Sequence, residues 1–199
     1  MLEKSRPYDG PYLNQKRDLP FNGVYEINNY LENSTASLID AELFRPNGIV
    51  VSQDGKMLYV SESCTRNFDS SCSEGMIKFH QYAIDVSRRH VLPKKVGSFS
   101  FEVQGLGASD GLKIHQPTGL IVSSCPSGLC IIKPMVLRKS KTSENTTHGE
   151  LIAHIKIGDT PTKVSNLVFG SEFLYVTGLK EKYTAKIYRI KLSNSNGNS

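Results

Sequence analysis

The sequence predicts an all-β fold, a partial β-propeller of about three and a half blades, each blade a four-stranded antiparallel sheet. Three observations lead to this prediction. Short β-branched runs dominate, no long stretch shows an apolar period of 3.6 residues, and one strand–turn–strand unit recurs along the chain. The 199 residues, with 38% hydrophobic and 22% charged content, are ordinary for a folded domain.

The recurring unit consists of two short runs joined by a tight turn that contains glycine, which is the pattern of a β-hairpin. Its three copies span 48–63, 111–125 and 166–178. A further strand follows each copy, at 77–85, 129–134 and 185–192, and edge-like runs lead into each unit, at 36–43, 96–101 and 150–157. One more strand, at 23–28, stands ahead of the first hairpin.

The spacing of the units favours a propeller over a β-sandwich, the alternative all-β fold. Asp110 follows Asn47 by 63 positions, and Asn166 follows Asp110 by 56. Blades repeat at about 40 to 50 residues, so inserted loops account for the longer spacing. Propellers close with about four to eight blades. We therefore expect one incomplete propeller domain over 1–199, with N-terminal blades missing, and self-association through its open sheet edges.

Polar residues begin each unit at matching positions. They are Asn47-Gly48, Asp110-Gly111 and Asn166-Leu167. Because the innermost strands of a propeller start at one end of its central channel, these side chains are expected to converge there. Amide and carboxylate oxygens are hard ligands that suit Ca²⁺ or Mg²⁺. Asn-Gly and Asp-Gly are also common turn pairs, but their recurrence in successive units favours a site.

Four segments carry a resemblance to a known family. They are "DGPYLNQKRDLPFNGVYEI" (9–27), "FRPNGIVVSQDGKMLYVSES" (44–63), "SDGLKIHQPTGLIVSS" (109–124) and "VSNLVFGSEFLYVTG" (164–178). In this order they resemble the gluconolactonase and senescence-marker-protein family, nearest its bacterial and fungal gluconolactonase branch. Members are six-bladed propellers that hold a divalent cation in the central channel and hydrolyse lactones. The resemblance covers nearly the whole chain and matches the C-terminal half of the family, from its third blade onward.

The resemblance implies roles for individual residues. Asn47 would bind the cation, and Asp110 would bind it and act as the general base, while Asn166 and Tyr12 would contact the substrate or support the ligands. Ca²⁺ is the expected cation, with Mg²⁺, Zn²⁺ or Mn²⁺ as alternatives. The family's glutamate ligand and its second-blade asparagine have no counterpart here, and Leu13 replaces the last glycine of the D-P-P-Y-G segment. Half of the cation site is therefore expected.

Two functional hypotheses follow, together with a related third. The first is a divalent-cation-dependent lactone hydrolase with a small-molecule lactone as substrate. The alternative is a catalytically incompetent truncated propeller that binds a ligand or a partner chain. A relative with esterase or paraoxonase-like activity is the third, because one fold hosts many functions.

Several functional classes find no support in the sequence. No apolar run approaches 18 residues, so no transmembrane helix and no membrane contact are expected. The net charge of +5 is mild, and the basic clusters lack interleaved aromatic residues, so nucleic acid is not an expected partner. Neither a G-x-S-x-G elbow nor a phosphate-binding loop is present.

The four cysteines form two close pairs, Cys64 with Cys72 and Cys125 with Cys130. Both pairs are candidate disulfides; the turn at 126–128 can set Cys125 and Cys130 across a hairpin, and two inert thiols fit the sequence equally well. Sequons make Asn33 and Asn145 candidate glycosylation sites. Together these features weakly favour a secretory or extracellular location over the cytoplasm, although the first residues show no signal-peptide pattern.

Overall fold

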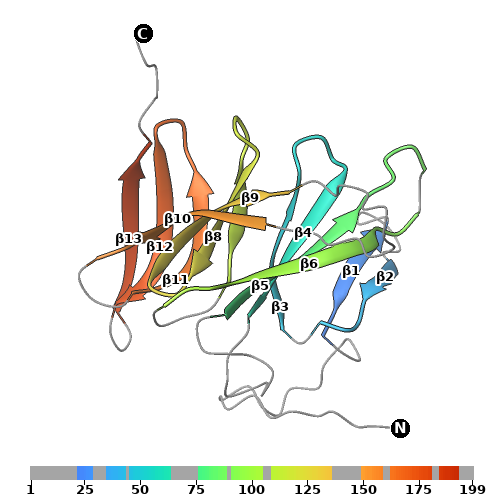
Figure 1. Ribbon diagram of the computed structural model, residues 1–199, viewed down its shortest axis with the longest axis horizontal. Coiled ribbons are helices and arrows are strands. Elements are labelled where there is room, and N and C mark those ends of the chain that lie inside the picture. The colour runs from blue at the N-terminus through green and yellow to red at the C-terminus, as the bar shows by residue number, and fades with distance from the viewer. Residues whose placement is uncertain are drawn as a thin grey trace, which may run out of the picture.

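The computed structural model describes residues 22–28, 35–43, 45–63, 76–88, 91–104, 109–135, 149–158, 162–180 and 184–192. These residues form thirteen strands in four antiparallel sheets and contain no helix (Figure 1). The all-β prediction is confirmed, and two of the four sheets are four-stranded and antiparallel as predicted, whereas the others have two and three strands in the described residues. The predictions for Tyr12, Asn33, Cys64, Cys72 and Asn145 lie outside the described residues. No helix long and apolar enough to cross a membrane occurs in the described ranges.

Each sheet is built from strands that follow one another in the chain. A two-stranded sheet contains β1 (Val24–Asn28) and β2 (Thr35–Asp40). The first four-stranded sheet contains β3 (Pro46–Val51), β4 (Met57–Ser63), β5 (Met76–Ala83) and β6 (Lys94–Glu102). The second contains β7 (Leu112–His115), β8 (Leu120–Cys125), β9 (Gly128–Pro134) and β10 (Gly149–Lys156). A three-stranded sheet contains β11 (Thr162–Phe169), β12 (Phe173–Lys180) and β13 (Thr184–Lys191).

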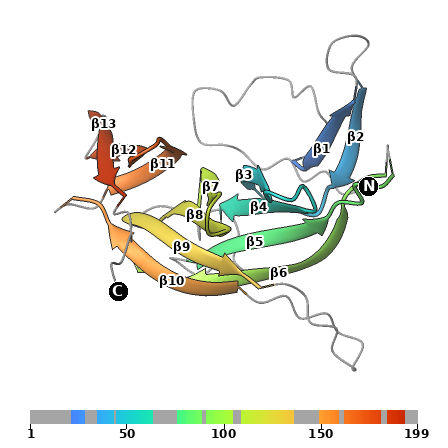
Figure 2. The same cartoon turned by 90° about the horizontal axis from the view of Figure 1, so that it is seen from above.

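The three predicted hairpins correspond to β3–β4, β7–β8 and β11–β12, each paired antiparallel. The predicted edge-like runs are strands β2, β6 and β10, and the last two lie at the outer edges of their sheets. Figures 1 and 2 show the sheets side by side in chain order around an arc, with β6 and β10 on its outer side. Strand β7 contacts both β3 and β11, so the first strands of successive sheets adjoin one another.

The core lies between the faces of neighbouring sheets. Phe79 and Phe99 of the β3–β6 sheet pack with Ile121 and Ile132 of the β7–β10 sheet, and all four are buried. The β7–β10 and β11–β13 sheets share a second cluster, and the two-stranded sheet shares a third with β4 and β5. Each large apolar side chain that is fully buried stabilises the fold by about 1.5–3 kcal/mol. Because both faces of the β3–β6 sheet are covered, Leu58 to Ser63 are buried without alternation.

Asp40 joins the two-stranded sheet to the β3–β6 sheet through a buried carboxylate. It accepts hydrogen bonds from Tyr82 Oη at 2.7 Å, from Lys95 Nζ at 2.8 Å and from the backbone amide of Glu42 at 2.8 Å. Burial alone would raise the pKa of Asp40, but the hydrogen bonds from Lys95, Tyr82 and Glu42 outweigh it, so the pKa lies below its ordinary value. The ionised form is therefore the one that the fold stabilises.

We predict that Asp40→Asn lowers the free energy of unfolding at neutral pH by about 1–3 kcal/mol, because charged hydrogen bonds are replaced by weaker ones. A group whose pKa is lowered by folding stabilises above its unfolded pKa of about 3.9, and the contribution is lost as the pH falls through the folded pKa. In urea unfolding between pH 7 and pH 3, the free energy of unfolding should therefore fall less in Asp40→Asn than in the wild type. An equal acid loss in the wild type and in Asp40→Asn would contradict this assignment.

Candidate functional site

Asn47 and Asp110, the two predicted ligands, come together from adjacent sheets. Asn47 lies in β3 within an irregularity of the β3–β4 pairing, between Pro46 and Ile49, and Asp110 stands two residues before β7. The Asn47 side chain hydrogen-bonds the Asp110 carboxyl group, and its Nδ2 also donates to Ser63 Oγ at 3.0 Å. A register shift of this kind re-aims a side chain at the end of a strand. Asn47 is exposed and Asp110 half-buried, so both are open to a ligand.

The glycines of the two motifs allow the sheets to approach. A Cβ at Gly48 would lie 2.2 Å from the carbonyl oxygen of Asp110 and 2.4 Å from Leu112 Cδ2. A Cβ at Gly111 would lie 2.5 Å from Asn166 Oδ1 and 2.9 Å from Asn166 Cα. No side chain fits at such distances. In Asn47-Gly48 and in Asp110-Gly111, the first residue therefore places a polar side chain at the strand end, and the glycine lets the next sheet come close.

Buried serines link the β3–β6 and β7–β10 sheets around this contact. Ser61 Oγ accepts the Gly48 amide at 2.9 Å and donates to the carbonyl oxygen of Asp110 at 2.9 Å. Ser63 Oγ donates to the carbonyl oxygen of Ser109 at 2.5 Å. These serines are not among the site residues predicted from the sequence. Hydroxyl residues inside otherwise apolar strand runs, as in "YVSES" and "IVSSC", were the available signal.

The charge of Asp110 is partly desolvated. Burial raises the pKa of Asp110 above its ordinary value, and the hydrogen bond from Asn47 and the positive charge of Arg45 oppose this effect without cancelling it. Without a bound cation, the ionised carboxylate is therefore less well stabilised here than in water. A further positive charge beside the Asp110 carboxylate, such as a bound cation, would instead favour the ionised form.

Asn166 occupies the equivalent place in the third sheet. Its Oδ1 accepts the amide of Leu167 at 2.8 Å, and it lies against Gly111, whose amide donates to the Ser165 carbonyl at 2.9 Å. Asn166 is thus a neighbour of the Asp110 backbone, with its amide oxygen already engaged. Substrate contact for Asn166 stays a prediction.

The chemistry of the donors fits a hard cation in part. Asn47 and Asp110 offer one amide and one carboxylate group, whereas tight Ca²⁺ sites use about six to eight oxygens. The described residues contain no group of three His, Cys, Asp or Glu side chains that could hold a metal. Glu62, a buried acid opposite Pro46, is instead engaged by His80 Nε2 at 2.8 Å and Lys78 Nζ at 3.5 Å. The remaining ligands would therefore be water, substrate or residues beyond those described.

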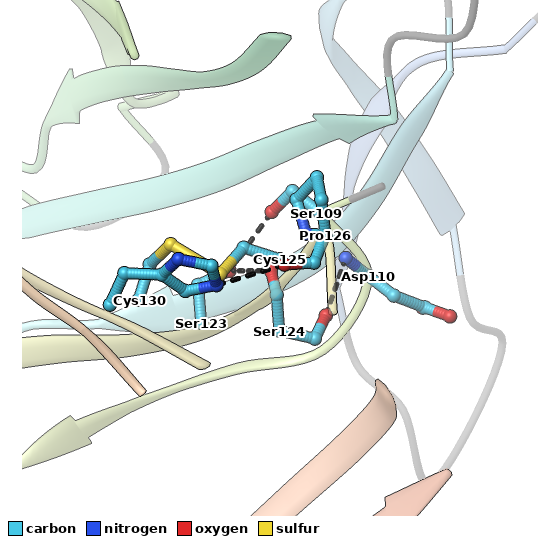
Figure 3. The surroundings of a disulfide bond; sticks show 8 residues. Ser109, Asp110, Ser123, Ser124, Cys125, Pro126 and Cys130 are labelled. Carbon is cyan, nitrogen blue, oxygen red and sulfur yellow. Dashed lines mark hydrogen bonds between the residues drawn. A yellow bond between two sulfur atoms is a disulfide. The ribbon is translucent and has the colours of Figure 1, made fainter. Parts of the chain in front are cut away.

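Cys125 and Cys130 form a disulfide across the β8–β9 hairpin, with a Cα–Cα distance of 5.9 Å. Cys125 is the last residue of β8, directly after Ser123 and Ser124. Figure 3 shows Ser109, Asp110 and these two serines gathered next to the disulfide.

Comparisons with known proteins show the fold. No family model matches the chain, and no curated protein matches it. Among solved structures, a luciferin-regenerating enzyme, which has a propeller-like fold, aligns with a TM-score of 0.52 and 19% sequence identity. The alignment covers 79% of this chain and 48% of that enzyme, so the chain spans about half of its length. Together with the successive antiparallel sheets, this likeness establishes a propeller-like all-β architecture.

We predict that Gly48→Ala destabilises the fold by at least about 1–3 kcal/mol, because its new methyl group collides with the backbone of the next sheet. Gly170→Ala is the matched control. There the nearest atom to a Cβ, at 3.0 Å, is the ring edge of Tyr175. The control should change the free energy of unfolding by less than about 1 kcal/mol. Equal losses for both variants in urea unfolding would show that the close approach at Gly48 is not restrictive.

We also predict that Asp110→Asn raises the melting temperature of the cation-free protein at pH 7. A carboxyl group whose pKa is raised by folding destabilises the fold as the pH rises through the window between its unfolded and folded pKa values. Above that window the charge is a net cost, which the neutral amide removes. In thermal melts in a chelating buffer, the increase in melting temperature of Asp110→Asn over the wild type should shrink as the pH falls towards 4. A lower melting temperature for Asp110→Asn than for the wild type at pH 7 would refute the prediction.

Proposed function

We propose that the chain is part of a divalent-cation-dependent lactone hydrolase, with Asn47 and Asp110 as cation ligands and Asp110 as the general base. One observation carries the proposal. An amide and a carboxylate from equivalent positions of adjacent sheets stand at neighbouring ends of the inner strands, open to solvent. A Cβ at Gly48, next to Asn47, would lie 2.2 Å from the Asp110 carbonyl oxygen, and a hydrogen bond from the Asn47 side chain acts on the pKa of Asp110. A carboxylate kept half-buried at a cost to stability is more readily explained by function than by folding.

Two further lines support this function. The motifs around Asn47, Asp110 and Asn166 resemble those of the gluconolactonase and senescence-marker-protein family, whose members use the positions of Asn47 and Asp110 for the cation and the base. The propeller-like neighbour, a luciferin-regenerating enzyme, is itself an enzyme. We favour Ca²⁺ as the cation, because the donors offered by Asn47 and Asp110 are oxygen atoms, which are hard ligands.

The residues of the chain divide the chemistry between them. A divalent cation, when bound, polarises a carbonyl group and lowers the pKa of a bound water. Asp110 accepts a proton from the water that attacks the lactone carbonyl carbon. The ring C–O bond then breaks, the proton passes from Asp110 to the departing ring oxygen, and a hydroxy acid is released with Asp110 ionised again. Asn47 holds the Asp110 carboxyl group by a hydrogen bond. For its amide oxygen to face a cation, the Asn47 amide has to turn its nitrogen away from Asp110.

The test combines cation binding with turnover of sugar and aliphatic lactones. Wild-type protein should bind Ca²⁺ in calorimetry and hydrolyse a lactone only when the cation is present, as followed by acid release. Asp110→Asn should lower kcat by about 10²–10⁴-fold, the usual contribution of a general base, and Asn47→Ala should weaken Ca²⁺ binding. Asp54→Asn is the matched control, because Asp54 is an exposed acid in the β3–β4 turn that bonds Ser52 and Lys56.

Each outcome separates the hypotheses. Loss of turnover in Asp110→Asn, with Asp54→Asn unchanged, supports the hydrolase. Ca²⁺ or lactone binding without turnover in the wild type would instead support a module that binds a ligand and catalyses nothing. Turnover that survives both chelation and Asp110→Asn would refute the assigned site.

A further inference from the structure

Both polar groups of the Asp110 backbone are held by buried serines. Ser61 Oγ, from β4 of the preceding sheet, donates to the Asp110 carbonyl oxygen at 2.9 Å. The Asp110 amide donates to Ser124 Oγ, from β8 of its own sheet, at 2.8 Å. Both serines are 0% exposed, so water does not compete for these bonds. The backbone that carries the carboxylate is therefore fixed from two sheets at once.

Ser124 belongs to a tightly held hairpin. The next residue, Cys125, is bonded to Cys130, and the Ser124 amide donates to the Gly111 carbonyl at 2.9 Å. In the turn, His154 Nε2 lies 2.9 Å from the Pro126 carbonyl oxygen. A Cβ at Gly128 would come within 2.0 Å of the Ile155 carbonyl oxygen. Figure 3 shows the Asp110 nitrogen facing Ser124, which lies between Asp110 and the disulfide-bonded Cys125.

We propose that Ser61 and Ser124 are positioning residues for the Asp110 carboxylate, and that the Cys125–Cys130 disulfide anchors Ser124 for this role. The inference rests on the proposed function, because it concerns the cation site of that function. Asp110 precedes β7 rather than lying within it, so no ladder hydrogen bonds of a strand hold it in register. The backbone hydrogen bonds of Gly111 to Ser165 and Ser124 hold the next residue, whereas the two serine side chains hold the Asp110 backbone itself. Loss of such supporting partners typically weakens metal binding by about 10–100-fold.

Ser123 provides a matched control. It is the neighbour of Ser124 in β8, is equally buried and bonds Ser109 Oγ at 2.9 Å and the Ser124 carbonyl at 2.9 Å. Its hydroxyl group makes no hydrogen bond to Asp110 in these contacts. Ser123→Ala and Ser124→Ala thus remove the same atom from the same buried strand, and only the second removes a partner of Asp110.

The experiment uses the full chain and two readouts. The first is the affinity for CaCl₂ by calorimetry, and the second is the amide hydrogen-exchange rate of Asp110 by NMR in a cation-free buffer. Ser124→Ala should weaken Ca²⁺ binding by about tenfold or more and speed hydrogen exchange of the Asp110 amide. Ser124→Thr keeps a hydroxyl group, so its Ca²⁺ affinity and exchange rate should lie between those of the wild type and of Ser124→Ala. Ser123→Ala should change neither by more than about twofold, even if it lowers the melting temperature.

Two further variants complete the test. Ser61→Ala should weaken Ca²⁺ binding while the bond from the Asp110 amide to Ser124 persists, and it serves as the second probe if Ser124→Ala does not fold. The double variant Cys125→Ser/Cys130→Ser should move affinity and exchange in the same direction as Ser124→Ala. Added to Ser124→Ala, it should have little further effect, because both act through one contact.

Failure of this inference is distinguishable from failure of the proposed function. If Ser124→Ala leaves the exchange rate of the Asp110 amide unchanged, or if Ser123→Ala has the same effects, the positioning role is overturned. If the wild-type protein does not bind Ca²⁺ at all, the proposed function fails. The exchange rates alone then decide whether Ser124 holds Asp110.

Discussion

The close approach of successive inner strands is the constraint on which the rest of this structure depends. At Gly48 the backbone of one sheet reaches the carbonyl of Asp110 in the next, and at Gly111 the same happens with Asn166. Sheets that meet so closely at their inner ends can fan apart at their outer ends, where Phe79, Phe99 and their neighbours fill the space. The arc of sheets in Figure 2 follows from this wedge-like packing.

The same contact creates the candidate site. Because the residue before each glycine stands at the strand end, the approach of two sheets brings Asn47 beside Asp110. The carboxylate is then partly desolvated, with Asn47 and Arg45 compensating only in part. Buried serines satisfy the backbone at this junction and leave the Asp110 carboxyl group for Asn47 and for a ligand. On the proposed function, structure and chemistry thus share one set of residues, so Asp110→Asn, which we expect to stabilise the fold, would also remove the general base.

Much of the fold could be predicted from local pattern. Turn glycines and β-branched runs located all three hairpins, because turn geometry and strand propensity act over a few residues. The meeting of Asn47 with Asp110 followed from the repeat, since equivalent positions of successive sheets lie side by side. Serines inside apolar strand runs were visible in the sequence, but their partners across the sheets could not be foreseen, because these depend on how two separately encoded sheets pack. The partners of Asp40 lie 42 and 55 residues away, at Tyr82 and Lys95, and no local pattern marks them. Whether Cys125 and Cys130 form a disulfide could not be decided from the sequence, because their spacing is also compatible with two free thiols.

The most direct test of the central claim, that a divalent cation binds between Asn47 and Asp110, is a Mn²⁺ titration followed by ¹⁵N-resolved NMR. The paramagnetic ion broadens the resonances of residues around it and so locates its own site. If the cation binds there, the amides of Asn47, Gly48 and Gly111 broaden first, and added Ca²⁺ reverses the broadening. Broadening centred on exposed acids such as Asp54 or Asp85, with the inner strand ends unaffected, would show that the cation does not bind between Asn47 and Asp110.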